Sequence, residues 1–164
     1  MPENKLHILG INPGTKYTGF AVFWGPELRD WGVKTFKGRW SKEKMKRIRE
    51  VISGYIHQYS INILAIKKLH PSRCSANLKK LVIEIKNYCR RKGLKIFSHS
   101  IQELEAYFSK EKKINKKALA EIMALEYPAL FHELEKERRN KNPYFWRLFE
   151  AVALGSACCY QNEK

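Results

Sequence analysis

The sequence predicts an α/β fold in which a mixed sheet carries helices on both faces. Three observations predict it: three strand-like segments follow one another within residues 5–36, two amphipathic segments with helical spacing come later, and a short apolar run follows each of them. Two strands connected through a helix pair in parallel, whereas strands connected by short turns pair antiparallel. The sheet is therefore expected to contain a three-stranded antiparallel meander and additional parallel strands.

The turn residues set the limits of the meander. The apolar run that begins at Leu6 stops at Asn12, because the Pro-Gly pair at 13–14 demands a turn. Residues 18–24 are rich in β-branched and aromatic side chains, a Gly-Pro pair follows them, and residues 28–36 alternate as a third strand would. The first strand is therefore expected to end at Asn12.

Helices and strands alternate in the rest of the chain. Ser41 is a candidate N-cap for a helix that reaches Ile56, and the apolar run at 61–66 predicts a buried parallel strand ending near Lys67. A second helix precedes Gly93. The remaining expectations are a strand at 94–97, helices at 101–108, 118–126 and 144–160, a charged stretch at 110–117 and a loop at 138–141. No repeat or low-complexity linker divides the chain, so residues 1–164 are expected to form a single domain.

The charge of the chain indicates a polyanionic partner. Lys and Arg total 32 against 16 Asp and Glu, which gives a formal net charge of +16. Nucleic acid gains affinity from such a surface by releasing counterions, and aromatic residues, 12% of the chain, are available for stacking. Nucleic acid is therefore the expected partner.

The four cysteines, Cys74, Cys89, Cys158 and Cys159, show no C-x-x-C pair and no histidine at ligand spacing. They are interpreted as reduced thiols. No stretch approaches the roughly 18–20 apolar residues that span a bilayer. The protein is expected to be soluble, in the cytoplasm or another compartment that contains DNA, without a membrane partner.

The predicted site lies where the central parallel strands end, because ligands of α/β sheets collect at the carboxyl ends of such strands. Here those ends are Asn12 and Lys67. Three motifs around these positions resemble the RuvC family of Holliday-junction resolvases: ILGINPGT with YTGF at 8–20, LAIKK with SANL at 64–78, and FEAVAL at 149–154. The resemblance extends over residues 5 to 160 and implies an RNase H-like fold with a five-stranded mixed sheet.

The resemblance also implies a dimeric nuclease in which four carboxylates bind two Mg²⁺ ions. At the four positions this chain has Asn12, Lys67, Arg147 and Glu150, whose formal charges sum to +1. An ammonium about 4 Å from a dication opposes its binding by about 8 kcal/mol at an effective dielectric constant near 20. Our hypothesis is a degenerate site without a cofactor, in which Lys67 pairs with Glu150 and a DNA phosphate binds beside them. Mg²⁺ is expected only if the acids are restored.

Several basic residues are candidates for contact with nucleic acid. The resemblance implies that the loop after the fourth strand approaches the centre of a junction, where an aromatic ring stacks on a base, and His70 is the nearest equivalent. The candidates are Lys16, Lys68, His70, Arg73, Lys110, Lys112, Lys113, Lys116 and Lys117. A further basic cluster is equally consistent with a solvated helix face: Lys37, Arg39, Lys42, Lys44, Lys46, Arg47 and Arg49.

Two other functions stay open from the sequence. One is an active Mg²⁺-dependent junction endonuclease in which Asn12 is an engineered replacement of an aspartate. The other is an RNA-binding or ribosome-associated scaffold, since a pre-ribosomal RNA nuclease family has the same fold and a similar Pro-Gly-Thr turn. The resemblance further implies a homodimer through the helix at 75–91, although burial in the core explains the apolar residues of that helix equally well.

Overall fold

The computed structural model describes residues 6–72, 74–109, 114–140 and 144–162. Its centre is a five-stranded sheet with the strand order β3-β2-β1-β4-β5. β1 pairs antiparallel with β2 and parallel with β4, β2 pairs antiparallel with β3, and β4 pairs parallel with β5. The strands are β1 (His7–Asn12), β2 (Tyr17–Trp24), β3 (Glu27–Thr35), β4 (Ile63–Lys67) and β5 (Lys95–His99). The predicted meander and the predicted parallel strands are both confirmed.

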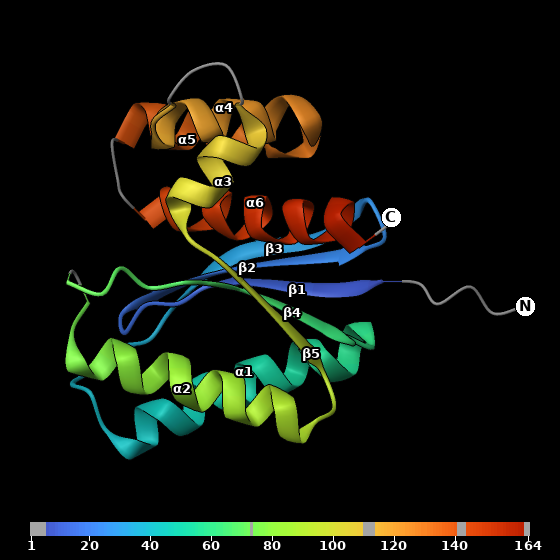
Figure 1. Ribbon diagram of the computed structural model, residues 1–164. Helices are drawn as coiled ribbons and strands as arrows, with labels where there is room; N and C mark the ends of the chain where they lie inside the picture. The colour runs from blue at the N-terminus through green and yellow to red at the C-terminus, as the bar shows by residue number, and fades with distance from the viewer. Residues whose placement is uncertain (1–5, 73, 110–113, 141–143, 163–164) are drawn as a thin grey trace, which may run out of the picture.

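Helices cover both faces of the sheet (Figure 1). α1 and α2 lie on one face, and α6 crosses the other, with α3, α4 and α5 on its outer side. Their bounds are α1 (Lys42–Tyr59), α2 (Ala76–Arg91), α3 (Ile101–Phe108), α4 (Lys116–Glu126), α5 (Phe131–Asn140) and α6 (Tyr144–Asn162), with a 3-10 turn η1 (Pro128–Leu130) between α4 and α5. Within the described parts of the chain, no helix combines the length and apolar character that crossing a bilayer requires.

Two expectations about the helices were wrong at their boundaries. α4 begins at Lys116 rather than at residue 118, because the Asn115 side chain caps it by accepting from the backbone N–H of Ala118 at 2.9 Å. Lys116 and Lys117 therefore lie in the first turn of a helix and not in a connecting stretch. The segment at 138–140, expected to be a loop, belongs to α5, and Lys141 lies outside the described residues.

α6 lies so close to the sheet that two positions beneath it have no room for a side chain. A Cβ atom at Gly10 would lie 2.4 Å from the carbonyl oxygen of Ala151, and one at Gly19 would lie 2.1 Å from that of Arg147. This close approach of α6 to β1 and β2 brings the first turns of the helix down to the end of β1. The position of Glu150 beside Asn12 follows from it.

We expect Gly19→Ala to lower the free energy of unfolding by about 1–3 kcal/mol, because α6 must move away from β2 to admit the methyl group. Gly32→Ala is the matched control, since a Cβ atom there meets nothing within 4 Å. The control is expected to change stability by less than about 0.5 kcal/mol. Urea denaturation measures both variants, and equal stability of the two would contradict the packing described above.

The cysteines behave as the sequence predicts: all four are thiols rather than members of disulfides, and three of them are buried in the core. Burial raises the pKa of Cys89 and of Cys158 to about 12, well above the ordinary value of 9.0. Each therefore contributes stability that is complete below pH 9 and is lost as the pH rises toward 12, because the unfolded chain releases the thiol protons first.

We expect stability to fall between pH 8.5 and 10.5 by up to about 1.4 kcal/mol per pH unit for each thiol. Lys44 makes the folded protein more stable as the pH rises, because burial lowers its pKa and the folded protein releases that proton before the unfolded chain does. Two thiols outweigh one ammonium, so the net change is a loss. Urea midpoints across this range measure it, and the Cys89→Ala, Cys158→Ala double variant should show a flatter profile. An unchanged slope in that variant would assign the loss to other groups.

Candidate nucleic-acid interface

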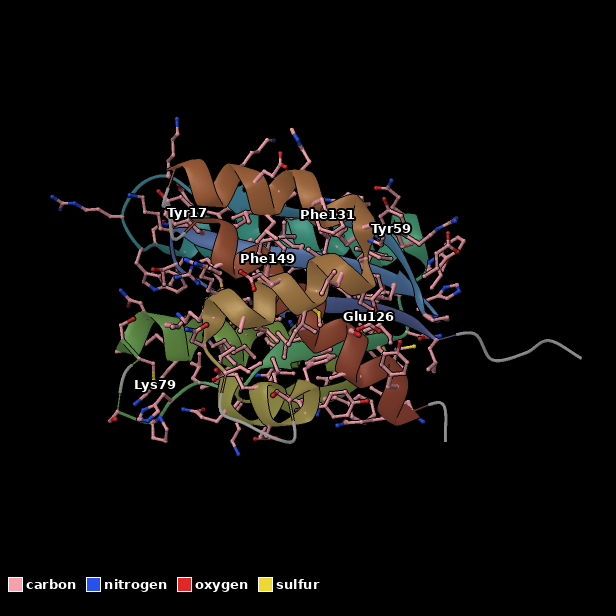
Figure 2. The ribbon with its side chains drawn as sticks, turned by 90° about the horizontal axis from the view of Figure 1, so that it is seen from above. Tyr17, Tyr59, Lys79, Glu126, Phe131 and Phe149 are labelled. Carbon is pink, nitrogen blue, oxygen red and sulfur yellow. The ribbon has the colours of Figure 1, made fainter. Side chains whose placement is uncertain are left out.

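Several elements meet at one edge of the sheet, on the left in Figure 1. β1, β4 and β5 end there, α2 and α3 begin there, and the first turns of α4 and α6 reach the same place. In Figure 2, Tyr17 and Lys79 lie toward this end of the molecule, whereas Tyr59 and Glu126 lie toward the opposite end. Helix N-termini carry a partial positive charge, so the backbone itself favours an anion at this edge.

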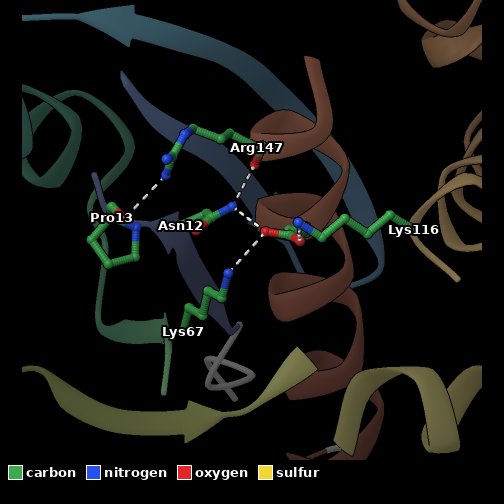
Figure 3. A network of polar contacts seen from close by, with 6 residues as sticks. Asn12, Pro13, Lys67, Lys116 and Arg147 are labelled. Atoms are coloured by element: carbon green, nitrogen blue, oxygen red, sulfur yellow. Dashed lines mark hydrogen bonds and ion pairs between the residues drawn. The ribbon is translucent and has the colours of Figure 1, made fainter. Parts of the chain in front are cut away.

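The Glu150 carboxylate is the centre of this edge, and the residue is 4% exposed. Figure 3 shows the side chains of Asn12, Lys67 and Lys116, which come from different elements, converging at this place. The carboxylate Oε2 atom accepts a hydrogen bond from Asn12 Nδ2 and lies 3.3 Å from Lys67 Nζ, which donates to it. Its Oε1 atom lies 3.8 Å from Lys116 Nζ. The carboxylate is thus held between one amide and two ammonium groups from three different elements. A buried charge needs such compensation to be tolerated.

Arg147 lies three residues before Glu150 in the first turn of α6, and its side chain reaches the turn after β1. Its guanidinium Nη1 donates to the carbonyl oxygen of Pro13 at 3.3 Å and covers the turn between β1 and β2, while its backbone oxygen accepts from Asn12 Nδ2 at 3.5 Å. A Cβ atom at Gly14 would lie 2.1 Å from the backbone carbonyl oxygen of Tyr17, so the turn itself needs a glycine, and it would also lie 2.6 Å from this guanidinium nitrogen. The Thr18 hydroxyl donates to the Gly14 carbonyl at 2.9 Å.

The structure brings Asn12, Lys67 and Glu150 together and adds Lys116, whose pairing with Glu150 the sequence did not indicate. The formal charges of Lys67, Lys116, Arg147 and Glu150 sum to +2. Nothing in the local pattern around Lys116 points to Glu150, because the contact depends on how α4 packs on α6. A helix N-terminus placed near an acid is the only signal that would have suggested it.

The donor set does not fit a divalent cation. Among the described residues there is no group of three or more His, Cys, Asp or Glu side chains that could hold a metal ion. Asn12 Oδ1 and Glu150 Oε1 are buried without a hydrogen-bond partner, but the first is a neutral oxygen and the second belongs to a carboxylate that already faces two ammonium groups. Hard cations need several oxygen ligands, and each ammonium about 4 Å away opposes a dication by about 8 kcal/mol.

A cleft of about 600 Å³ opens in front of these residues. Lys67, Lys68, Lys116 and Arg147 supply its basic lining, and Leu69, Pro71, Leu78 and Ile101 supply apolar walls. Lys67 is 24% exposed and Lys116 is 59% exposed, so both ammonium groups keep access to a ligand while they face Glu150. The arrangement is suited to an anionic group next to an apolar one.

Of the other residues predicted to contact nucleic acid, some line this cleft and others lie elsewhere. His70 and Lys68 lie in its lining, and the exposed His70 ring has its Nδ1 atom 2.9 Å from the Ser72 hydroxyl. Lys16 is exposed on the turn after β1, 5.3 Å from the centre of the Tyr17 ring, and Lys117 is exposed in the first turn of α4. Arg73, Lys110, Lys112 and Lys113 lie outside the described residues.

The basic cluster of α1 is not a uniform solvated face. Lys44 is buried, and its ammonium donates to the carbonyl oxygen of Gly38 at 2.8 Å, which closes the loop before α1. Arg47 donates to the carbonyl oxygen of Lys37 at 2.9 Å. Both side chains therefore hold the loop, although burial lowers the pKa of Lys44. The exposed residues of the cluster are Lys37, Arg39, Lys42, Lys46 and Arg47.

Comparison with known proteins identifies the fold. No family model matches the sequence, and no curated protein matches it either. Among solved structures, RuvC from Thermus thermophilus matches with a TM-score of 0.73, 13% identity and 96% of each chain covered. A structure of T. thermophilus RuvC in complex with a Holliday junction substrate matches with a TM-score of 0.73, 14% identity and the same coverage. The chain thus has the RNase H-like fold in the form found in RuvC.

We expect Asn12→Asp to lower the free energy of unfolding at pH 7 by about 1–3 kcal/mol, because it places a second carboxylate against Glu150. Two such groups share a proton, so their pKa is raised above that of the unfolded chain. The loss relative to the wild type should therefore shrink as the pH falls from 7 to 4.5.

Urea unfolding at the two pH values measures this difference. Asn87→Asp, at an exposed position on α2, is the matched control and should shift stability by less than about 0.5 kcal/mol at either pH. A destabilisation by Asn12→Asp that does not depend on pH would show that Glu150 and the new carboxylate do not interact.

Proposed function

We propose that this protein binds the sugar-phosphate backbone of branched DNA at the edge formed by Lys67, Lys116 and Arg147, and does not cleave it. The observation that carries the proposal is the Lys67 ammonium 3.3 Å from Glu150, in the place where the strands β1 and β4 end. A fixed cation there attracts a phosphate and repels a metal ion. The RuvC-like fold and the net charge of +16 support nucleic acid as the ligand.

The binding follows from the charges of the chain itself. Glu150 orients Lys67 and Lys116 without neutralising both, so the cleft keeps a positive excess for one phosphate group. An ammonium can donate in three directions. Lys67 donates one hydrogen bond to the carboxylate, and Lys116 faces it at 3.8 Å as an ion pair. Release of condensed counterions from the DNA supplies most of the affinity, which makes binding strongly dependent on salt.

Cleavage of a phosphodiester in this fold would need an activated water and a stabilised leaving oxygen. The described residues of the edge include two carboxylates: Glu150, which is already paired with two ammonium groups, and Glu103, which lines the cleft and accepts from the backbone N–H of Ser100 at 3.4 Å. They do not form a cluster of acids that could hold a metal ion, and the proposal assigns neither the role of activating water. The homodimer and the intracellular location expected from the sequence are part of the same proposal.

We expect the protein to bind a four-way DNA junction more tightly than duplex DNA, and to leave it intact in Mg²⁺ or Mn²⁺. Fluorescence anisotropy at several salt concentrations measures binding, and gel electrophoresis of end-labelled junctions measures cleavage. The same assay with structured RNA separates the DNA proposal from an RNA-binding scaffold. Metal-dependent cleavage would show that the site is an active endonuclease, and tighter binding of RNA would redirect the proposal to RNA.

Variants of the edge give the sharper test. Lys116→Met should weaken junction binding and lower the slope of log K against log salt by about 1, since one phosphate contact is lost. Lys95→Met, on an exposed lysine at the start of β5 on the opposite edge, is the matched control and should leave the slope unchanged. Glu150→Gln should tighten binding about fivefold, equivalent to about 1 kcal/mol. A Glu150→Gln variant that loses binding would overturn the charge argument.

A further inference from the structure

A second cluster of cations lies where the turn between β1 and β2 meets the loop before α1. β3 ends at this side of the sheet, and the backbone N–H of Phe36, just after it, donates to the carbonyl oxygen of Lys16 at 2.8 Å. The chain then passes through residues 36–41 into α1, and Figure 1 shows the start of α1 on the same side of the molecule as the turn. The binding proposed for Lys67, Lys116 and Arg147 makes no use of this surface.

α1 holds two of these cations on one of its faces. Lys44 and Arg47 are three residues apart, a spacing that makes them neighbours on a helix. Lys44 Nζ donates to the carbonyl oxygen of Gly38 at 2.8 Å. Arg47 Nη2 donates to that of Lys37 at 2.9 Å. Both cations are therefore tied to the loop and keep a fixed position.

The cluster contains a buried positive charge without a negative partner. Lys44 is 3% exposed, its hydrogen bond goes to a neutral carbonyl, and no ion pair joins it to an acid among the described residues. Burial lowers its pKa, and the charges of Arg47 and Lys16 lower the pKa further. Glu43, next to it in the sequence, is exposed and pairs with neither Lys44 nor Arg47. Since buried charges are normally paired, an anion from outside the chain would stabilise this arrangement.

We propose that Lys16, Lys44 and Arg47 form a second phosphate site, which holds the backbone of the nucleic acid where it extends beyond the edge. This assignment rests on the nucleic-acid binding proposed above. Lys16 and Arg47 are exposed and contact phosphate oxygens, whereas the buried Lys44 adds its charge from within the loop. An ammonium and a guanidinium both donate charge-assisted hydrogen bonds to phosphate. Lys37, exposed on the same loop, supplies a neighbouring contact.

The turn between β1 and β2 connects the two sites. Arg147 of the edge donates to the carbonyl oxygen of Pro13 at one end of this turn, and Lys16 lies at the other end. Three steps along the backbone span at most about 11 Å between Cα atoms. Duplex DNA carries one phosphate charge per roughly 1.7 Å of its axis, so one arm has phosphates for both sites.

The surroundings of the cluster favour nucleic acid over an acidic protein. The exposed residues that flank the cluster in the chain are themselves largely cationic and include Lys34, Lys37 and Arg39. Phe36 is buried, and the large apolar side chains that are exposed in the described parts of the chain all belong to α2, α4, α5 and α6. A protein partner would find no apolar anchor here, and such anchors carry most of the affinity of protein interfaces. A polyanion needs none.

The sharpest test uses Lys16→Met, because the Lys16 side chain contacts only the Tyr17 ring, 5.3 Å from its centre. We expect it to weaken binding of a four-way junction by about three- to tenfold and to lower the slope of log K against log salt by about 1. Arg47→Met should lower the slope by the same amount. Lys46→Met is the matched control, since Lys46 is exposed on α1 two residues from Lys44 and faces another direction. It should leave the slope unchanged.

Acetylation of the folded protein, read by mass spectrometry, locates the contact independently of any variant. The junction should protect Lys16 and Lys37 about threefold or more, and leave Lys46 and Lys95 as reactive as in the free protein. Inorganic phosphate alone and polyglutamate are the two comparison ligands. Equal protection of Lys16 by inorganic phosphate would assign the cluster to a free phosphate ion, and equal protection by polyglutamate would assign it to an acidic protein. Either result would overturn the proposal.

The outcomes separate this inference from the proposed function. A junction that is bound more weakly by Lys116→Met but equally well by Lys16→Met, Arg47→Met and the wild type would refute the second site and leave the edge in place. A wild-type protein that binds no junction would refute both. Circular dichroism confirms that each variant is folded, and Lys16→Met remains decisive if Arg47→Met loosens the loop.

Discussion

The ion pair between Lys67 and Glu150 is the interaction on which the functional edge of this protein depends. α6 lies against β1 and β2 because Gly10 and Gly19 leave no side chain between them, and this packing buries Glu150 at the end of β1. A buried carboxylate is costly unless charge and hydrogen bonds compensate it. Lys67 from β4, Lys116 from α4 and the Asn12 amide supply that compensation, so the pair also ties α4 and α6 to the parallel half of the sheet.

The contact between Lys67 and Glu150 also means that the positive charge at this site comes from the protein itself. In a carboxylate-rich arrangement a diffusible dication would supply the positive charge, and the affinity for phosphate would then depend on that ion. Here the positive charge is covalently part of the chain, so it persists in the presence of a chelator. It also brings no bound water that a metal would acidify. The proposed function therefore places a phosphate at the strand ends by means of these fixed cations and without a bound metal ion.

The sequence predicted the parts of the structure that depend on local pattern. The strand ends at Asn12 and Lys67 follow from the Pro-Gly turn and from a compact apolar run, and α/β topology then makes those ends neighbours. Contacts that depend on packing between helices were not predictable. Lys116 reaches Glu150 because α4, capped by Asn115, begins at Lys116 and packs on α6. Lys44 turns inward to the Gly38 carbonyl, although Lys42 and Lys46, two residues away on either side, are exposed. Charge patterning along a helix does not separate these two cases.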